Sequence, residues 1–397
     1  MTTIVIPTYN RPQYLRRTLR YYEAMGCPYP IVVGDSSADE SLDTNRETIS
    51  SLQTSLSIEH LEFKSTTEFF EKLALIFERL DGDYALMCAD DDFVTPTGIG
   101  ECVTFLDAHP DFSVAHGYAA VVGVKPESSC PSRPCAHAHQ YVQRTVDRET
   151  GAARLMDHLA NYSTTFYSVH RLKDIARNWR ISFENTTDLR FGELLPSCLS
   201  VIQGKVKCLD ILYMVRQTNP DSTSKKGFTW FDLITSGSYS GRYTPFRDRL
   251  AEQLVECSEI SIEEACETAN QAFTAYLGRV MPQIVKKYSD EWGIVPITGF
   301  QNDTDHLQKA SGPLGKIKQS LMRILEVAEY ELTEKRLVDV VRLPYDAYDR
   351  VKHEYLQREA QKDPMAFDNL ISSKSHYHKD FLPILDSISR FPNGIEI

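Results

Sequence analysis

The stretch TIVIPTYNRPQYLRRTLRYYEAM (residues 3–25) decides the expected fold, because it joins an apolar strand to an amphipathic helix through a short polar turn. Residues 3–7 form the continuous apolar run of a buried strand. Apolar side chains then recur at helical spacing from Tyr14. Pro12 suits the first turn of this helix, and Asn10 is the expected cap.

The same alternation of strand and helix continues to residue 89. Further strands are predicted at 29–37, 58–63 and 83–89, and an amphipathic helix is predicted at 67–80. An alternation of this kind predicts an α/β fold, with a mostly parallel sheet and helices on both of its faces.

Polar residues follow three of the predicted strands. Thr8 and Tyr9 follow the first, Asp35 lies at the end of the second, and three consecutive aspartates (90–92) follow the fourth. Ligands of open α/β sheets bind beyond the carboxyl ends of the strands, so we expect one crevice to hold all of these residues. Three adjacent carboxylates repel one another and are hard to desolvate unless a cation is present. An acidic turn without a ligand is the alternative.

The composition is that of an ordinary soluble globular protein, with 397 residues, 42% hydrophobic and 25% charged. A net charge of −12 disfavours nucleic acid or an anionic membrane surface as a partner. The nine cysteines show no paired spacing that would predict a disulfide framework. There is neither a signal-peptide pattern nor an apolar run of about eighteen residues, so we predict a cytoplasmic protein without a transmembrane segment.

The remainder of the chain mixes strands and helices before it becomes mainly helical. Strands are predicted at 112–124, 141–146, 164–170 and 207–217, with helices at 97–108 and 191–204. The turn-rich stretch 218–227 is the preferred domain boundary. We therefore expect a first domain at 1–220 and a helical domain at 221–397. Acceptor binding, a homodimer interface and membrane docking remain open as roles for the helical domain.

Four stretches, in this order, resemble the family 2 glycosyltransferases: TIVIPTYNRPQYLRRTL (3–19), VVGDSS (32–37), GDYALMCADDDF (82–93) and FGELLPSCLSVIQGKVKCLD (191–210). The resemblance covers roughly residues 1–220. It implies the nucleotide-diphospho-sugar transferase fold called GT-A, a Rossmann-like, mostly parallel sheet flanked by helices.

The resemblance implies that the strand ends bind the nucleotide-sugar donor. Thr8 and Tyr9 would line the base pocket, and Asp35 would contact the base. Asp90 and Asp92, two residues apart, would hold Mn²⁺ or Mg²⁺ on the sugar diphosphate, because hard cations take carboxylate and phosphate oxygens. The implied nucleotide-binding residues are Pro7, Thr8, Tyr9, Arg11, Asp35, Lys72, Asp90 and Asp91, and the implied metal ligands are Asp92 and Asp90.

The resemblance also implies a general base at the head of a helix, eleven positions before a glycine that precedes a strand. Glu193 lies eleven positions before Gly204 and is the first choice. Where the family usually has two adjacent acids, this sequence has Gly192 and Glu193, so Asp188 is a second candidate and Glu184 a third. An acid at a helix start is also favoured by the helix macrodipole alone, which is the structural alternative.

These residues predict a metal-dependent, inverting glycosyltransferase. The donor would be a nucleotide-diphospho-sugar, most simply a UDP-sugar, and the acceptor a hydroxyl of a saccharide or glycolipid. Arg216, after the last predicted core strand, could face the diphosphate. A nucleotidyltransferase is an alternative, although PTYNRP (7–12) lacks the glycines of a phosphate-binding loop. A non-catalytic protein that binds sugar nucleotides or glycans is another. The spacing of Cys130, Cys135, His137 and His139 fits no zinc module.

Overall fold

A computed structural model describes residues 1–124, 135–218, 229–291 and 363–391. Its strands are β1 (Thr2–Thr8), β2 (Ile31–Asp35), β3 (Ile58–Glu62), β4 (Tyr84–Met87), β5 (Phe93–Val94), β6 (Phe112–Val124), β7 (Cys135–Tyr141), β8 (Val169–Arg171) and β9 (Lys205–Thr218). They form one sheet in the order β3-β2-β1-β4-β8-β6-β9-β5, and β7 pairs with β6.

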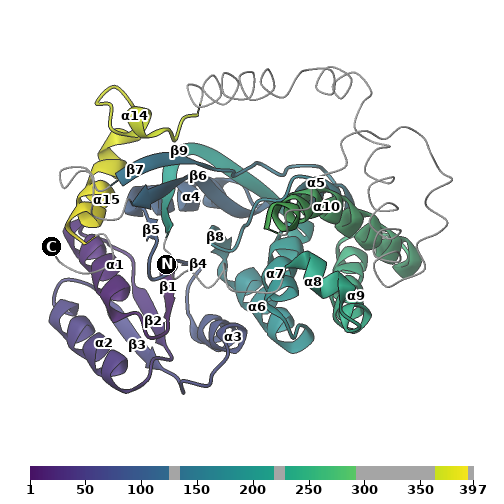
Figure 1. Cartoon of the computed structure of the whole chain (residues 1–397), viewed down its shortest axis with the longest axis horizontal. Helices are drawn as coiled ribbons and strands as arrows, with labels where there is room; N and C mark the ends of the chain where they lie inside the picture. Colours follow the sequence, from purple (N-terminus) through teal and green to yellow (C-terminus); the bar gives the residue numbers. More distant parts are fainter. Residues whose placement is uncertain (125–134, 219–228, 292–362, 392–397) are drawn as a thin grey trace.

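The first half of the sheet is parallel and the second half is mixed. β3, β2, β1 and β4 run parallel, β8 is antiparallel to both of its neighbours, and β6 and β9 are again parallel. Figure 1 shows α1 and α2 on one side of β1–β3 and α3 on the other. The predicted α/β class is therefore confirmed.

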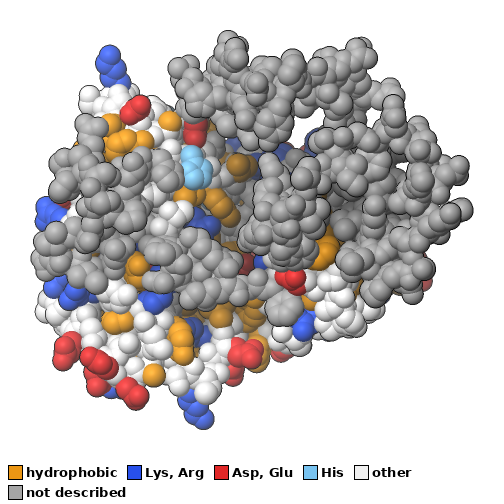
Figure 2. Space-filling model, in the orientation of Figure 1, with side chains coloured by type: hydrophobic (Ala, Val, Ile, Leu, Met, Phe, Trp, Pro, Cys, Tyr) orange, Lys and Arg blue, Asp and Glu red, His pale blue; other side chains and the backbone are white. Residues whose placement is uncertain are grey.

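The helices described before residue 218 are α1 (Pro12–Ala24), α2 (Asp39–Leu52), α3 (Phe69–Arg79), α4 (Pro96–Ala108), α5 (Gly151–Ala160), α6 (Leu172–Asn185) and α7 (Leu189–Gln203). After it come α8 (Trp230–Thr235), α9 (Tyr239–Cys257), α10 (Ile262–Glu291), α14 (Phe367–Leu370) and α15 (His378–Arg390). No helix in the described ranges is long and apolar enough to cross a membrane. Acidic side chains gather over α2 on the face in Figure 2.

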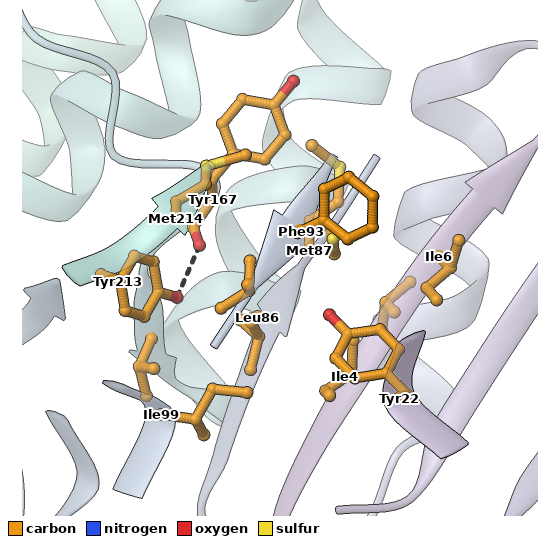
Figure 3. Close-up of a cluster of buried hydrophobic side chains, with 14 of the residues drawn as sticks. Ile4, Ile6, Tyr22, Leu86, Met87, Phe93, Ile99, Tyr167, Tyr213 and Met214 are labelled. Carbon is orange, nitrogen blue, oxygen red and sulfur yellow. Dashed lines mark hydrogen bonds between the residues drawn. The ribbon is translucent and has the colours of Figure 1, made fainter. Parts of the chain in front are cut away.

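The main hydrophobic core lies against the centre of the sheet. Ile4 on β1 and Leu86 on β4 are fully buried there, and Figure 3 shows them beside the aromatic rings of this core. The Tyr213 hydroxyl on β9 donates a hydrogen bond of 2.7 Å to the carbonyl of Tyr167, which joins the sheet to the segment before β8. This packing fixes the strand ends that carry the polar residues.

Two core clusters divide the helices. One is the sheet core, which also takes in Phe381, Ile384 and Ile388 of α15. The second combines α5 and α7 with α8–α10, around Phe191 and Phe273. Residues 219–228 lie outside the described residues, so a domain boundary near residue 220 stays a prediction.

Three local predictions differ from the structure. The strand expected at 141–146 is found earlier in the chain, as β7, which ends at Tyr141. Within 142–146 only Val146 pairs with the sheet, in an isolated bridge to Val206. The strand expected at 164–170 is the shorter β8. Helix α1 is capped at Arg11 rather than Asn10. Asn10 has a φ of 53°, a left-handed conformation that asparagine tolerates, and its side chain accepts a hydrogen bond from the Ala38 N–H at 2.9 Å.

Gly117 on β6 lies tightly against the backbone of β9. A Cβ added there would lie 2.5 Å from the carbonyl oxygen of Ile211, a backbone atom that cannot rotate away. We expect Gly117→Ala to lower the free energy of unfolding by about 1–3 kcal/mol. A Cβ added at Gly241 on α9 would have no other atom within 4 Å. Gly241→Ala should therefore leave the free energy of unfolding unchanged or raise it by up to about 1 kcal/mol. Urea unfolding checks both, and equal stability of the two variants would contradict the packing described.

Candidate active site

The polar ends of β1, β2 and β4 are joined by hydrogen bonds. β1 and β2 pair in register, so that Thr8 lies opposite Asp35. The Thr8 hydroxyl donates to Asp90 Oδ2 at 2.8 Å. The Lys72 ammonium on α3 donates to the Thr8 carbonyl and to Ser36 Oγ, both at 2.9 Å. The structure thus brings residues from the ends of three strands and from α3 together.

The acidic turn, Asp90–Asp92, is buried after β4. Asp90 is 4% exposed, Asp91 9% and Asp92 2%. Arg11 forms ion pairs with Asp90, at 3.3 Å, and with Asp91. Arg216 Nε donates to Asp92 Oδ2 at 3.2 Å. Arginines from α1 and β9 therefore offset the negative charge of the turn.

Two carboxyl groups of the acidic turn, those of Asp90 and Asp92, have raised pKa values. Burial raises the pKa of Asp90 to about 7, although Arg11 and the Thr8 hydroxyl oppose this. Burial likewise raises the pKa of Asp92 to about 6, against the effect of Arg216. In each case the adjacent Asp91 charge adds to the rise. A further cation at this place would favour the ionised forms.

Asp35 is fully buried, with both oxygens engaged. Oδ1 accepts the Ser37 N–H at 2.8 Å, and Oδ2 accepts the Asn45 amide at 2.8 Å. The His60 ring Nε2 lies 3.1 Å from the same Oδ2. Burial favours the neutral acid, but the hydrogen bonds from His60, Ser37 and Asn45 outweigh it and lower the pKa of Asp35. The sequence pattern does not mark Asn45 and His60 as partners of Asp35, because only the fold brings α2 and β3 to this carboxylate.

The other predicted nucleotide-binding residues lie in different surroundings. Pro7 is buried within β1, opposite Gly34 of β2. Tyr9 is 52% exposed, so its ring is open to a partner. Lys72 is only 3% exposed, and burial lowers its pKa to about 8. Its ammonium is thus anchored to the strand ends rather than solvated on a helix face.

Glu193 lies in the second turn of α7, in a half-buried position that raises its pKa, although Arg190 and Arg216 oppose the rise. Arg216 is thus coupled to Glu193 as well as to Asp92. The rings of Tyr141 and Tyr167 lie 4.9 and 5.0 Å from the Arg216 guanidinium. The first candidate base is therefore electrostatically linked to the acidic turn.

Gly192 on α7 makes room for the ring of Phe70 on α3. A Cβ at this position would lie 2.1 Å from the Phe70 ring. An acid in place of Gly192 would therefore collide with Phe70. This contact gives a physical reason for the single acid at Glu193.

Asp188, the second candidate base, is the N-cap of α7. Its Oδ1 accepts the N–H groups of Arg190 and Phe191, both at 3.0 Å. Capping of this kind satisfies helix donors and is a sufficient structural reason for an acid at that position.

The acidic turn fits a hard divalent cation. The described residues contain no preformed cluster of three or more His, Cys, Asp or Glu side chains around a common point. Mg²⁺ and Mn²⁺ do not need such a cluster, because they take one or two carboxylates together with substrate phosphates and water. Asp90 and Asp92 would supply those oxygens by exchanging their present hydrogen bonds and ion pairs for the cation. Cys130 lies outside the described residues, so the structure does not bear on a zinc site there.

The raised pKa of Asp90 should make the stability of the metal-free protein depend on pH. The carboxyl ionises near 3.8 when unfolded and near 7 when folded, so between these values the unfolded state binds fewer protons and stability falls as pH rises. Asp90→Asn removes this contribution. We expect the variant to gain stability relative to the wild type between about pH 4 and about pH 7. Urea unfolding at several pH values checks this, with the exposed Asp81→Asn as control, and a pH-independent difference would contradict it.

Comparison with known proteins gives a family for the first part of the chain. Residues 3–171 match the model of glycosyl transferase family 2. No curated protein sequence matches the chain. The chain is similar to the solved structure of S. aureus TarS 1–349, with 13% identity, 74% of this chain and 75% of that chain covered, and a TM-score of 0.46.

Two further structures are similar at comparable levels. The complex of S. aureus TarS 1–349 with UDP-GlcNAc has 11% identity, with 74% of this chain and 76% of that chain covered, and a TM-score of 0.47. Mannosyltransferase PcManGT from Pyrobaculum calidifontis, in complex with GDP-Man and Mn²⁺, has 12% identity, with 84% and 87% covered and a TM-score of 0.40. The segment that matches the family model contains β1–β4 and the acidic turn. Residues 3–171 belong to glycosyl transferase family 2.

Proposed function

We propose that this glycosyltransferase moves a sugar from a nucleotide-diphospho-sugar to an acceptor hydroxyl on a saccharide or glycolipid. A UDP-sugar is the first candidate for the donor. The transfer inverts the anomeric centre and depends on Mn²⁺ or Mg²⁺. The observation that carries the proposal is the buried acidic turn, hydrogen-bonded to Thr8 and paired with Arg11 and Arg216.

The donor would lie across the ends of β1, β2 and β4. Tyr9 offers an exposed ring on which the base can stack, and the Asp35 network borders the same place. Asp90 and Asp92 would hold the divalent ion, which neutralises charge on the departing nucleoside diphosphate. Arg11 and Arg216 already lie against these carboxylates. They can exchange part of that pairing for phosphate oxygens, since arginine binds both groups well.

Glu193 would take the acceptor's proton. As the acceptor oxygen attacks the anomeric carbon, the bond from that carbon to the diphosphate breaks and the hydroxyl proton moves to the Glu193 carboxylate. The half-buried position that raises the pKa of Glu193 makes it a stronger base. Asp188 is the second choice, because its Oδ1 is engaged in capping α7.

The first test is calorimetric titration of UDP and GDP, with and without Mn²⁺. We expect UDP to bind only with Mn²⁺ and expect Asp92→Ala to weaken this binding by about tenfold or more, since it removes a ligand of the ion. Asp81→Ala, an exposed acid just before β4, is the matched control and should bind as the wild type does. Failure of both nucleotides to bind, or binding that ignores Mn²⁺ and Asp92, means that the turn is not a donor site.

The second test concerns the proton acceptor. Glu193→Gln keeps the shape of the side chain but cannot accept the proton, so kcat should fall by about 10²–10⁴-fold while the affinity for UDP is unchanged. Asp188→Asn should keep its activity, because asparagine also caps helices well. Release of UDP from a panel of UDP-sugars measures both. Loss of turnover in Asp188→Asn alone would assign the base to Asp188, and wild-type binding without turnover would favour the non-catalytic alternative.

A further inference from the structure

We propose that Arg17 is a positioning residue for the acidic turn, and that through Arg17 the C-terminal helix α15 becomes a structural part of the donor site. The consequence for donor binding rests on the proposed function. The mechanical claim, that Arg17 and α15 hold the turn in place, can be tested without any substrate.

Arg17 joins three segments that are far apart in the sequence. It lies on α1 and is 1% exposed. Its Nη2 donates to the carbonyl of Asp91 at 2.8 Å, and its Nη1 donates to Gln217 Oε1 at 2.5 Å and to the carbonyl of Phe391 at 3.2 Å. These partners are 74, 200 and 374 positions away. One guanidinium therefore links the acidic turn, the end of β9 and the end of α15.

The chemistry of these contacts requires arginine. A guanidinium is a planar fork whose N–H groups point in fixed directions, whereas a lysine ammonium is a single point on a flexible stem. The fork lies over the Phe93 ring at 4.9 Å and over the Tyr14 ring at 5.3 Å, which restricts its rotation. Burial lowers the pKa of Arg17 to about 10, and the nearby charges of the acidic turn oppose that fall. The buried cation and the acidic turn thus stabilise each other.

The backbone of the acidic turn is held from α1. Thr18, the next residue, donates its hydroxyl to the carbonyl of Asp90 at 2.7 Å. The backbone N–H of Gln217, the residue whose side-chain Oε1 accepts from Arg17, donates to Asp92 Oδ1 at 3.2 Å. Without the Arg17 fork, the carbonyl of Asp91 and the end of β9 lose a shared anchor. The carboxylates at 90 and 92 then lose the fixed spacing that a metal and a diphosphate need.

Helix α15 reaches this network through its C-terminus. Figure 1 shows α15 beside α1, and Phe381, Ile384 and Ile388 are fully buried in the sheet core. Phe391 is the C-cap of α15. Carbonyls at a helix C-terminus lack partners within the helix and carry partial negative charge, so a buried arginine is a suitable partner. The docking of α15 therefore sets the position of one oxygen that Arg17 binds.

Two substitutions separate positioning from packing. Arg17→Met has a similar shape without charge or donors, and we expect it to lower stability, because it removes one buried charge and leaves the buried carboxylates less compensated. Arg17→Lys keeps the charge but loses the fork. We expect both variants to fold and to show faster amide hydrogen exchange in residues 84–93. Their Mn²⁺-dependent affinity for UDP should be lower by about 10- to 100-fold, and Arg17→Lys should be less affected than Arg17→Met. Arg20→Met, on the same helix but exposed, is the control.

A second pair of variants tests the role of α15. Ile388→Ala creates a cavity under the end of the helix and should speed exchange in residues 84–93 and weaken UDP binding in the same direction. Leu382→Ala lies on the same helix but is 42% exposed and should change neither. Both are compared with the wild type in the full-length protein.

The outcomes distinguish the two proposals. If the wild type binds UDP with Mn²⁺, while Arg17→Met shows unchanged affinity and unchanged exchange in 84–93, the positioning role of Arg17 is wrong and the proposed function stands. If the wild type binds no UDP but Arg17→Met speeds exchange in 84–93, the mechanical claim holds and the donor site is wrong. If Arg17→Met does not fold, Arg17→Lys decides, because wild-type exchange and affinity in that variant overturn the proposal. If Ile388→Ala shows the same exchange in 84–93 and the same UDP affinity as the wild type, the proposed role of α15 is wrong.

Discussion

Burial of three adjacent carboxylates is the constraint on which the rest of the site depends. Like charges so close together are costly to desolvate, and the chain reduces this cost with positive charge brought from elsewhere in the fold. Arg11 comes from the start of α1, Arg17 from its middle, and Arg216 from β9. Strand order, helix docking and loop conformation are thus tied to one electrostatic requirement.

This arrangement balances the formal charge of the acidic turn, with three arginines beside its three aspartates. Under the proposed function, a divalent ion and the diphosphate of the donor would bring charges that largely cancel, so the balance would change little on binding. The arginines differ in what they hold. Arg11 and Arg216 contact carboxylates, and a phosphate group can take the place of a carboxylate as their partner. Arg17 binds backbone and side-chain amide oxygens, and a phosphate group cannot take their place. Exchange of partners and maintenance of shape therefore fall to different residues.

Patterns local in sequence predicted the first part of the fold well. The apolar runs of β1, β2 and β4 and the turns after them could be located because burial and turn chemistry leave local signals. Helix α2 could not, because its buried positions include Asn45 and Thr48 and its apolar periodicity is weak. In the site, Thr8, Asp35 and the aspartates were visible as polar residues at strand ends. The partners Asn45, His60, Arg17 and Gln217 were not, because only tertiary contacts distinguish them from surface polar residues.

The bond between Arg17 and the carbonyl of Phe391 has a consequence for the order of synthesis. A ribosome completes β1–β9 before it makes α15, and about 170 residues separate Gln217 from Phe391. At roughly 5–20 residues per second, the new N-terminal part waits on the order of ten seconds or more for its last anchor. During that interval the sheet core lacks Phe381, Ile384 and Ile388. The acidic turn of a nascent chain is therefore assembled late, although its own residues are among the first to leave the ribosome.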